Sequence, residues 1–187
     1  VEGHDACRKI AILSSIISGK QVDFEDIYTE GITKITLEDI QYAKALDMKI
    51  KLLASCKRSG ESLSAIVAPH FVPKSHPLYN IEGVFNSIFV KGNMLGDSMF
   101  YGSGAGKLPT ASAVVSDVVD AVKHQGTNIM TIWEEEKVTL GDFNNFECRY
   151  LVRVKDTNTE EAIKAAFGDV DYVDAGIDGE KAFLTKV

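Results

Sequence analysis

The sequence predicts an α/β protein of the α+β type, in which helices cover one side of a mixed sheet and a small β-α-β-β module follows at the C-terminus. Three observations lead to this prediction. Helical and strand-like apolar periodicities are mixed between residues 5 and 123. Residues 124–146 are irregular and contain the acidic run Glu134-Glu135-Glu136. Residues 147–187 have a strand–helix–strand–strand order of their own.

The first predicted helix spans residues 5–18 and ends at Gly19, because glycine favours the left-handed C-terminal cap. Its apolar residues fall in two stripes: Ala6, Ile10, Leu13 and Ile17 form the first, and Ile12 and Ile16 form the second. We therefore expect the later turns of this helix to be buried on nearly all sides. Asp5 and Lys9 are one turn apart on one face.

The middle of the chain alternates between helix and strand signals. Thr36 with Asp39 resembles a capping box and predicts a helix over residues 37–46. Apolar alternation then predicts strands over 48–58 and 62–72. After a loop with two prolines, residues 83–90 and 94–101 read as strands about a Gly92–Asn93 turn, and a helix that has Pro109 in its first turn runs to Lys123.

The C-terminal module begins with a predicted strand over 148–155. A helix over 159–168 follows, and we expect Asp156 or Thr157 to cap it together with Glu160. Strands over 170–177 and 181–187 complete the module.

Composition excludes several classes of function. The 187-residue chain has a net charge of −7 and no basic stripe, so we expect no nucleic-acid partner. It has neither an apolar run of 18 residues nor a signal peptide at its start, so we expect a cytoplasmic protein with no membrane partner. The three cysteines are far apart and the four histidines lack ligand spacing, so we expect reduced thiols and no metal site.

A glycine-rich loop, Gly102-Ser103-Gly104-Ala105-Gly106-Lys107, precedes the helix that ends at Lys123. It fits neither the Rossmann fingerprint, whose third glycine comes one place later, nor the Walker A loop, which needs glycine at Tyr101 and Ser or Thr at Leu108. Backbone amides at a helix N-terminus still favour an anion. A ligand-binding loop and a tight strand-to-helix turn both remain open from the residues alone.

Asp5 and Lys9 also have two interpretations. As a surface pair, they would stabilise the helix by roughly a few tenths of a kcal/mol. As part of a cleft, a desolvated Lys9 would have a lowered pKa and exchange a proton near neutrality, while the carboxylate holds a polar substrate group.

Five segments together resemble homoserine dehydrogenases. The stretch from Glu2 to Lys9, EGHDACRK, matches the signature E-G-x-D-x-x-x-K of that family. The other matching segments, in the family's order, are Glu30-Gly31-Ile32, Ile50 to Ala54, Val72-Pro73 with His76-Pro77-Leu78, and Met99 to Gly102 continuing into Gly104-Ala105-Gly106 and Pro109 to Val114. The resemblance covers residues 1–123.

The resemblance implies an oxidoreductase of amino-acid biosynthesis. Such enzymes interconvert L-aspartate 4-semialdehyde and L-homoserine with NADP or NAD, on the aspartate pathway to threonine and methionine. In the family pattern, Lys9 is the catalytic proton donor, Asp5 binds the substrate and Gly106 lies against the cofactor. A homodimer is also implied.

The resemblance divides the chain into a catalytic, substrate-binding and dimerisation domain (1–123), a linker (124–146) and a partial ACT-like module (147–187). Because Val1 runs almost directly into a helix and no dinucleotide fingerprint is present, we expect a fragment without the N-terminal Rossmann domain, inactive by itself. Ser103 also replaces the proline of the family's G-P-G-A-G loop. One alternative is a regulatory module, in which the ACT-like tail binds an amino acid. The other is an oligomerisation module without catalysis.

Overall fold

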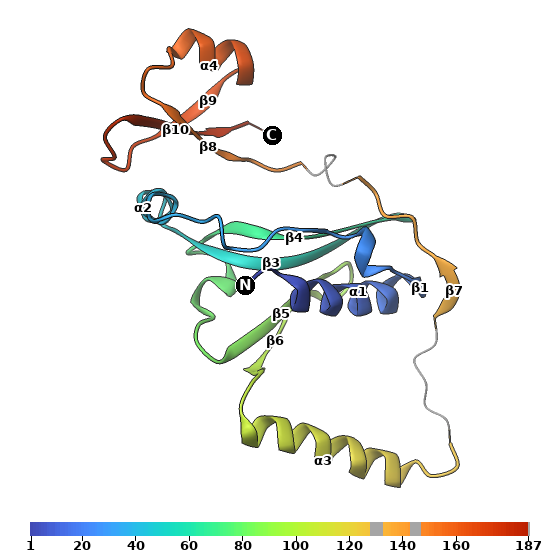
Figure 1. Cartoon of the computed structure of the whole chain (residues 1–187). Coiled ribbons are helices and arrows are strands. Elements are labelled where there is room, and N and C mark those ends of the chain that lie inside the picture. The colour runs from blue at the N-terminus through green and yellow to red at the C-terminus, as the bar shows by residue number, and fades with distance from the viewer. Residues whose placement is uncertain (128–132, 143–146, 187) are drawn as a thin grey trace. The chain divides into compact units, whose positions relative to one another are not determined.

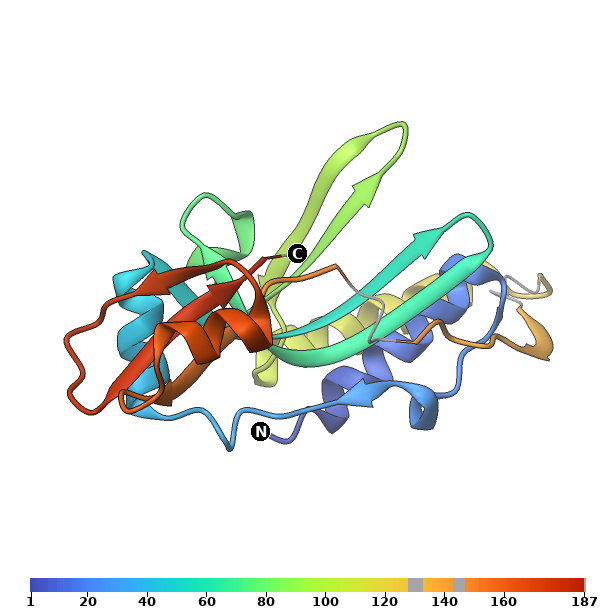
Figure 2. The ribbon, with the colours of Figure 1, turned by 90° about the horizontal axis from the view of Figure 1, so that it is seen from above.

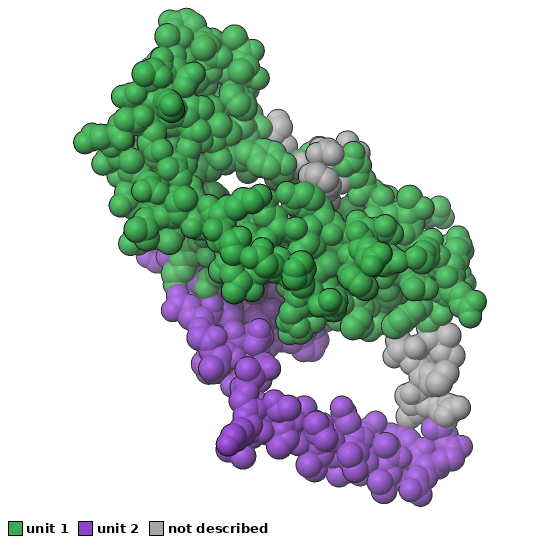
Figure 3. Space-filling view, viewed as in Figure 1, with its two compact units in different colours: residues 1–73, 132–187 green, residues 74–131 purple. Residues whose placement is uncertain are grey.

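The computed structural model describes residues 1–127, 133–142 and 147–186 of the chain. The chain forms two compact units, one made of residues 1–73 and 132–187 and the other of residues 74–131 (Figure 3). The units are described separately below. Helices and mixed sheets occur together, so the α+β fold class is confirmed. No described helix has the length and apolar character needed to cross a bilayer.

A three-stranded mixed sheet forms the centre of the first unit. Strands β3 (Met48–Ser59) and β4 (Ser62–Pro73) pair antiparallel along their whole length, as the sequence predicts. Gly60 turns the chain between them with a φ of 59°. A two-residue strand that the sequence did not predict, β2 (Tyr28–Thr29), pairs parallel with β4 on its other edge.

Helix α1 (His4–Ser18) packs against this sheet (Figure 1). It ends as predicted at Gly19, whose N–H donates to the carbonyl of Ser15 at 2.9 Å. The face toward the sheet buries Cys7, Ile10, Ala11, Ser14 and Ser15. The expected burial on all sides is wrong, because Ile12, Ile16 and Ile17 are about half exposed. One sheet can cover only one stripe of a helix.

Residues 134–142 contribute a strand of a second, two-stranded sheet and two core contacts to the first unit, although the sequence indicates an irregular stretch. Strand β7 (Glu134–Lys137) pairs parallel with β1 (Lys20–Gln21), which follows α1. Val138 and Leu140 then pack against the core. Four charged residues give no local strand signal, so this pairing depends on a partner more than 110 residues away. The rest of the predicted linker falls partly on 128–132 and 143–146, outside the described residues.

Helix α2 (Leu37–Ala45) has both hydrogen bonds of the predicted capping box, between Thr36 and Asp39. The C-terminal module consists of β8 (Leu151–Lys155), α4 (Glu160–Phe167), β9 (Val170–Val173) and β10 (Glu180–Thr185), in the antiparallel order β8-β10-β9 (Figure 2). Its elements follow the predicted order. The expected cap of α4 is wrong, because Thr159 accepts the hydrogen bond from the N–H of Ala162.

The second unit contains a hairpin and a long helix. Strands β5 (Phe85–Gly92) and β6 (Gly96–Ser103) pair antiparallel, and α3 (Lys107–Lys123) follows, all close to their predicted ranges. Inside the predicted loop before the hairpin there is a short 3-10 helix, η2 (Pro77–Asn80). His76 caps η2 by accepting a hydrogen bond from the N–H of Leu78 at 3.1 Å.

Candidate active site

The candidate catalytic pair, Asp5 and Lys9, lies on the first turns of α1. Helical spacing of four residues brings the Lys9 Nζ atom to 2.8 Å from the Asp5 carboxylate. Asp5 is also in the first turn, where the helix dipole favours a negative charge. The structure therefore brings together the two side chains that the sequence singled out.

Both side chains of the pair project into solvent. The Lys9 side chain is 69% exposed and that of Asp5 is 83% exposed. Because both side chains are in contact with water, the described part of the chain does not enclose Lys9 in a cleft. What the pair offers chemically is an ammonium group held beside a carboxylate at the start of a helix.

The start of α1 is anchored by Gly3, which is buried and precedes the helix in the left-handed conformation, with a φ of 86°. A Cβ at this position would lie 3.1 Å from side-chain atoms of both Thr29 and Val67. The carbonyl of Gly3 accepts a hydrogen bond from the N–H of Cys7 at 2.8 Å. A residue with a side chain would be both strained and crowded here, so glycine fixes where the first turn begins.

The candidate cofactor contact, Gly106, belongs to the second unit. It precedes α3 with a φ of 121°, a value that L-residues rarely adopt. No described side chain caps this end of the helix, so N–H groups of its first turn remain available to a ligand. The three glycines of the loop, Gly102, Gly104 and Gly106, carry no side chains that would block close approach to the backbone. These features fit the contact that a nicotinamide dinucleotide would need, and they also fit a tight turn.

The same loop explains Gly104 without a ligand. A Cβ on Gly104 would lie 1.9 Å from the amide nitrogen of the Asn86 side chain, and the Gly104 N–H donates to the carbonyl of Val84. A side chain on Gly104 would therefore require the exposed Asn86 side chain to move. Of the loop glycines, Gly106 is the one for which a ligand role stays a prediction.

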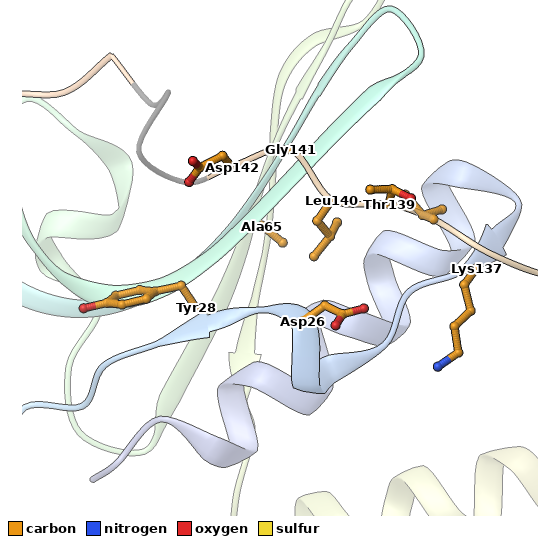
Figure 4. Close-up of a pocket in the computed structure, with 9 residues that line it drawn as sticks. Asp26, Tyr28, Ala65, Lys137, Thr139, Leu140, Gly141 and Asp142 are labelled. Atoms are coloured by element: carbon orange, nitrogen blue, oxygen red, sulfur yellow. The ribbon is translucent and has the colours of Figure 1, made fainter.

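A groove of about 480 Å³ lies elsewhere in the first unit, between β4, the segment before β2 and residues 137–142 (Figure 4). Asp26, Tyr28, Ala65 and Leu140 line it, and Lys137 at its end forms an ion pair with Asp23. No sequence motif pointed to these residues. Neither Asp5 nor Lys9 is among the residues that line this groove. No three His, Cys, Asp or Glu residues in the described part of the chain gather as a metal site.

Comparisons with known proteins give one consistent result. The family model described as homoserine dehydrogenase matches residues 1–119. Among curated relatives, a homoserine dehydrogenase of Mycobacterium leprae is 48% identical over 130 residues, covering 67% of this chain and 30% of the relative. One of Bacillus subtilis is 44% identical over 124 residues, covering 66% of this chain and 29% of the relative. The chain therefore spans less than a third of the length of these relatives.

Solved structures extend the likeness to the C-terminal module. A Staphylococcus aureus homoserine dehydrogenase superposes with a TM-score of 0.77 and 28% identity, covering 100% of this chain and 48% of that one. A hyperthermophilic archaeal homoserine dehydrogenase mutant, solved in complex with NADPH, superposes with a TM-score of 0.53 and 27% identity, covering 70% of this chain and 35% of that one. The family model stops at residue 119, whereas the fold of the staphylococcal enzyme matches the tail as well.

Proposed function

Because this chain belongs to the homoserine dehydrogenase family, we propose that it provides the catalytic region of an enzyme that interconverts L-aspartate 4-semialdehyde and L-homoserine with NADPH or NADH. The observation that supports this most directly is the Asp5–Lys9 pair. The two residues occupy the family signature, and their charged groups are 2.8 Å apart at the start of α1.

In the proposed reaction, Lys9 donates a proton to the carbonyl oxygen of the aldehyde. Reduction turns this oxygen into an alkoxide, and a nearby ammonium group both stabilises the negative charge and supplies the proton. Asp5 binds a polar group of the substrate. The nicotinamide supplies the hydride when it is bound. Gly106 gives the cofactor a backbone surface that no side chain obstructs.

The proposal divides the work along the chain. Residues 1–123 would carry catalysis, substrate binding and homodimer contacts. Residues 147–187 would form an ACT-like module, and residues 124–146 would link these two parts. The chain spans about 30% of its curated relatives, and its glycine loop departs from the dinucleotide fingerprints. We therefore propose that the cofactor is bound mainly by a further domain and that this chain alone does not turn over aspartate 4-semialdehyde. We also propose that the enzyme acts in the cytoplasm.

The test is NADPH oxidation with aspartate 4-semialdehyde, measured on a chimera in which this chain replaces the matching region of the M. leprae relative. Lys9→Ala is expected to lower kcat by about 10²–10⁴-fold, the usual contribution of a positioned general acid. The matched control is Lys164→Ala, which removes another mostly exposed lysine that pairs with an aspartate, at 3.3 Å. It should leave kcat unchanged.

Two results would contradict the proposal in different ways. Full activity of the Lys9→Ala chimera would remove Lys9 from the chemistry. An inactive but folded wild-type chimera would instead favour a binding or oligomerisation role for this chain. Turnover by the isolated chain would refute the predicted need for a further domain.

A further inference from the structure

The backbone at residues 30–32 lies against the segment that leads into α1. The N–H of Ile32 donates to the carbonyl of Val1 at 3.0 Å. Gly31 is buried beside this bond. A Cβ built on Gly31 would lie 2.3 Å from the Val1 oxygen and 2.5 Å from the Cα of Glu2. Both neighbours are backbone atoms, so a side chain could be admitted only if one chain segment moved.

Space alone requires glycine at position 31. Its φ is not positive, so the left-handed conformation that disfavours side chains does not apply there. Gly3 differs, because its φ of 86° would itself disfavour a side chain. Substitution of Gly31 therefore tests the close approach of two backbone segments, without a second effect from the dihedral angle.

The segment around Gly31 is in turn fixed by the sheet. Thr29 of β2 pairs with Val67 of β4, and the Glu30 N–H donates to the carbonyl of Val67 at 2.8 Å. Val67 is completely buried in the core of the first unit. The contact at Gly31 thus links the start of α1 to a buried part of the sheet.

The position of Asp5 and Lys9 depends on this anchor. Both side chains are mostly exposed, so packing of their own atoms does not hold them in place. Their location follows from the backbone of α1, whose first turn begins at Gly3, directly after Glu2. A shift of Val1 and Glu2 would move the first turn before it moved the buried residues further along the helix.

We propose that Gly31 is a positioning residue for Asp5 and Lys9: its missing side chain lets residues 30–32 contact the backbone of Val1 and Glu2, and this contact sets where α1 presents the pair. The inference rests on the proposed function for its catalytic consequence. Displacement of reacting groups by about 1 Å can cost about 10²-fold in rate.

The first arm of the test uses this chain by itself and measures hydrogen–deuterium exchange of individual amides. Gly31→Ala is expected to accelerate exchange at Ile32 and Cys7, whose N–H groups bond to Val1 and Gly3, by about tenfold or more. The control is Gly92→Ala, at a glycine that also lacks a left-handed φ and whose Cβ would meet no atom closer than 3.5 Å. It should leave both amides unchanged.

The second arm is a double-mutant cycle in the chimera. Gly31→Ala should lower kcat/KM by about 10–100-fold when Lys9 is present. In the Lys9→Ala background it should lower kcat/KM by less than about threefold, because the group that it displaces is already gone. Gly92→Ala should be neutral in both backgrounds.

The outcomes separate the inference from the proposed function. Unchanged exchange at Ile32 and Cys7, or an equal loss of activity with and without Lys9, would overturn the positioning role. An inactive but folded wild-type chimera would refute the proposed function, and a fully active Lys9→Ala chimera would refute the role of Lys9. In either case the exchange result alone would decide whether Gly31 anchors α1. If Gly31→Ala does not fold, native-state exchange of the wild type decides: the two amides should open together, and separate openings would overturn the proposal.

Discussion

Helices α1 and α3 are alike in sequence character but differ in what covers them. Each carries a stripe of aliphatic residues. Helix α1 buries five residues, whereas in α3, all of whose residues are described, none is buried and Val114, Val115, Val118, Val119 and Val122 remain exposed. The comparison teaches that an apolar stripe predicts a helix with two faces, while the neighbouring elements determine whether that stripe stabilises the fold.

The largest expected difference concerns core residues on the two helices. Ile10 is 8% exposed in the core under α1, so Ile10→Ala should lower the free energy of unfolding by about 2–5 kcal/mol. Val115 of α3 is 60% exposed, so Val115→Ala should change it by less than about 0.5 kcal/mol. Urea unfolding followed by circular dichroism measures both. Equal losses would show that α3 is as well covered as α1.

Helix α2 is an intermediate case, because charged groups help to cover it. Arg153 of β8 donates to Asp39 at 2.7 Å and to Thr36 at 3.0 Å, and it also pairs with Glu180 at 2.9 Å. Arg153→Ala should cost about 1.5–3 kcal/mol of unfolding free energy, since it removes the guanidinium group that pairs with two partly buried carboxylates. The matched control is Arg149→Ala, at a more exposed pair with Asp171, which should have a much smaller effect.

The stability that the Arg153–Asp39 contact contributes should also decrease at low pH. Burial opposes ionisation of Asp39, but hydrogen bonds from the Thr36 backbone and from Arg153 hold the pKa of Asp39 below its ordinary value. The stability that this carboxylate contributes is therefore present above about pH 4 and is lost as the pH falls through the lowered pKa of the folded state. The difference between wild type and Arg153→Ala should shrink over that range, and a difference that grows would contradict this account.

The smallest expected effects distinguish two neighbouring serines of α1. Ser15 Oγ donates to the carbonyl of Ala11 and accepts from the N–H of Val22, both at 2.9 Å, so Ser15→Ala should cost about 1–3 kcal/mol. Ser14 is equally buried, but its hydroxyl has no hydrogen-bond partner among the described residues. Ser14→Ala should therefore be neutral or slightly stabilising. Thermal unfolding of both variants gives the comparison, and a larger loss at Ser14 would point to a partner for its hydroxyl.

Short-range signals in the sequence were enough to predict the local structure and the family. Gly19 and the Thr36–Asp39 box mark where two helices end or begin, and alternation marks the two hairpins, because these signals involve residues within a few positions of one another. The same short-range spacing placed Asp5 and Lys9 on one face of a helix.

Only the tertiary structure decided how distant segments meet. It left Ile12 and Ile16 exposed, paired the acidic strand β7 with β1, joined Arg153 to α2 and brought Gly31 against the backbone of Glu2. Each of these depends on which surface lies opposite, and neither propensity nor periodicity carries that information. The exposure of Lys9 likewise follows from the tertiary structure. The residues packed around a side chain determine its solvation, and its position in a motif does not.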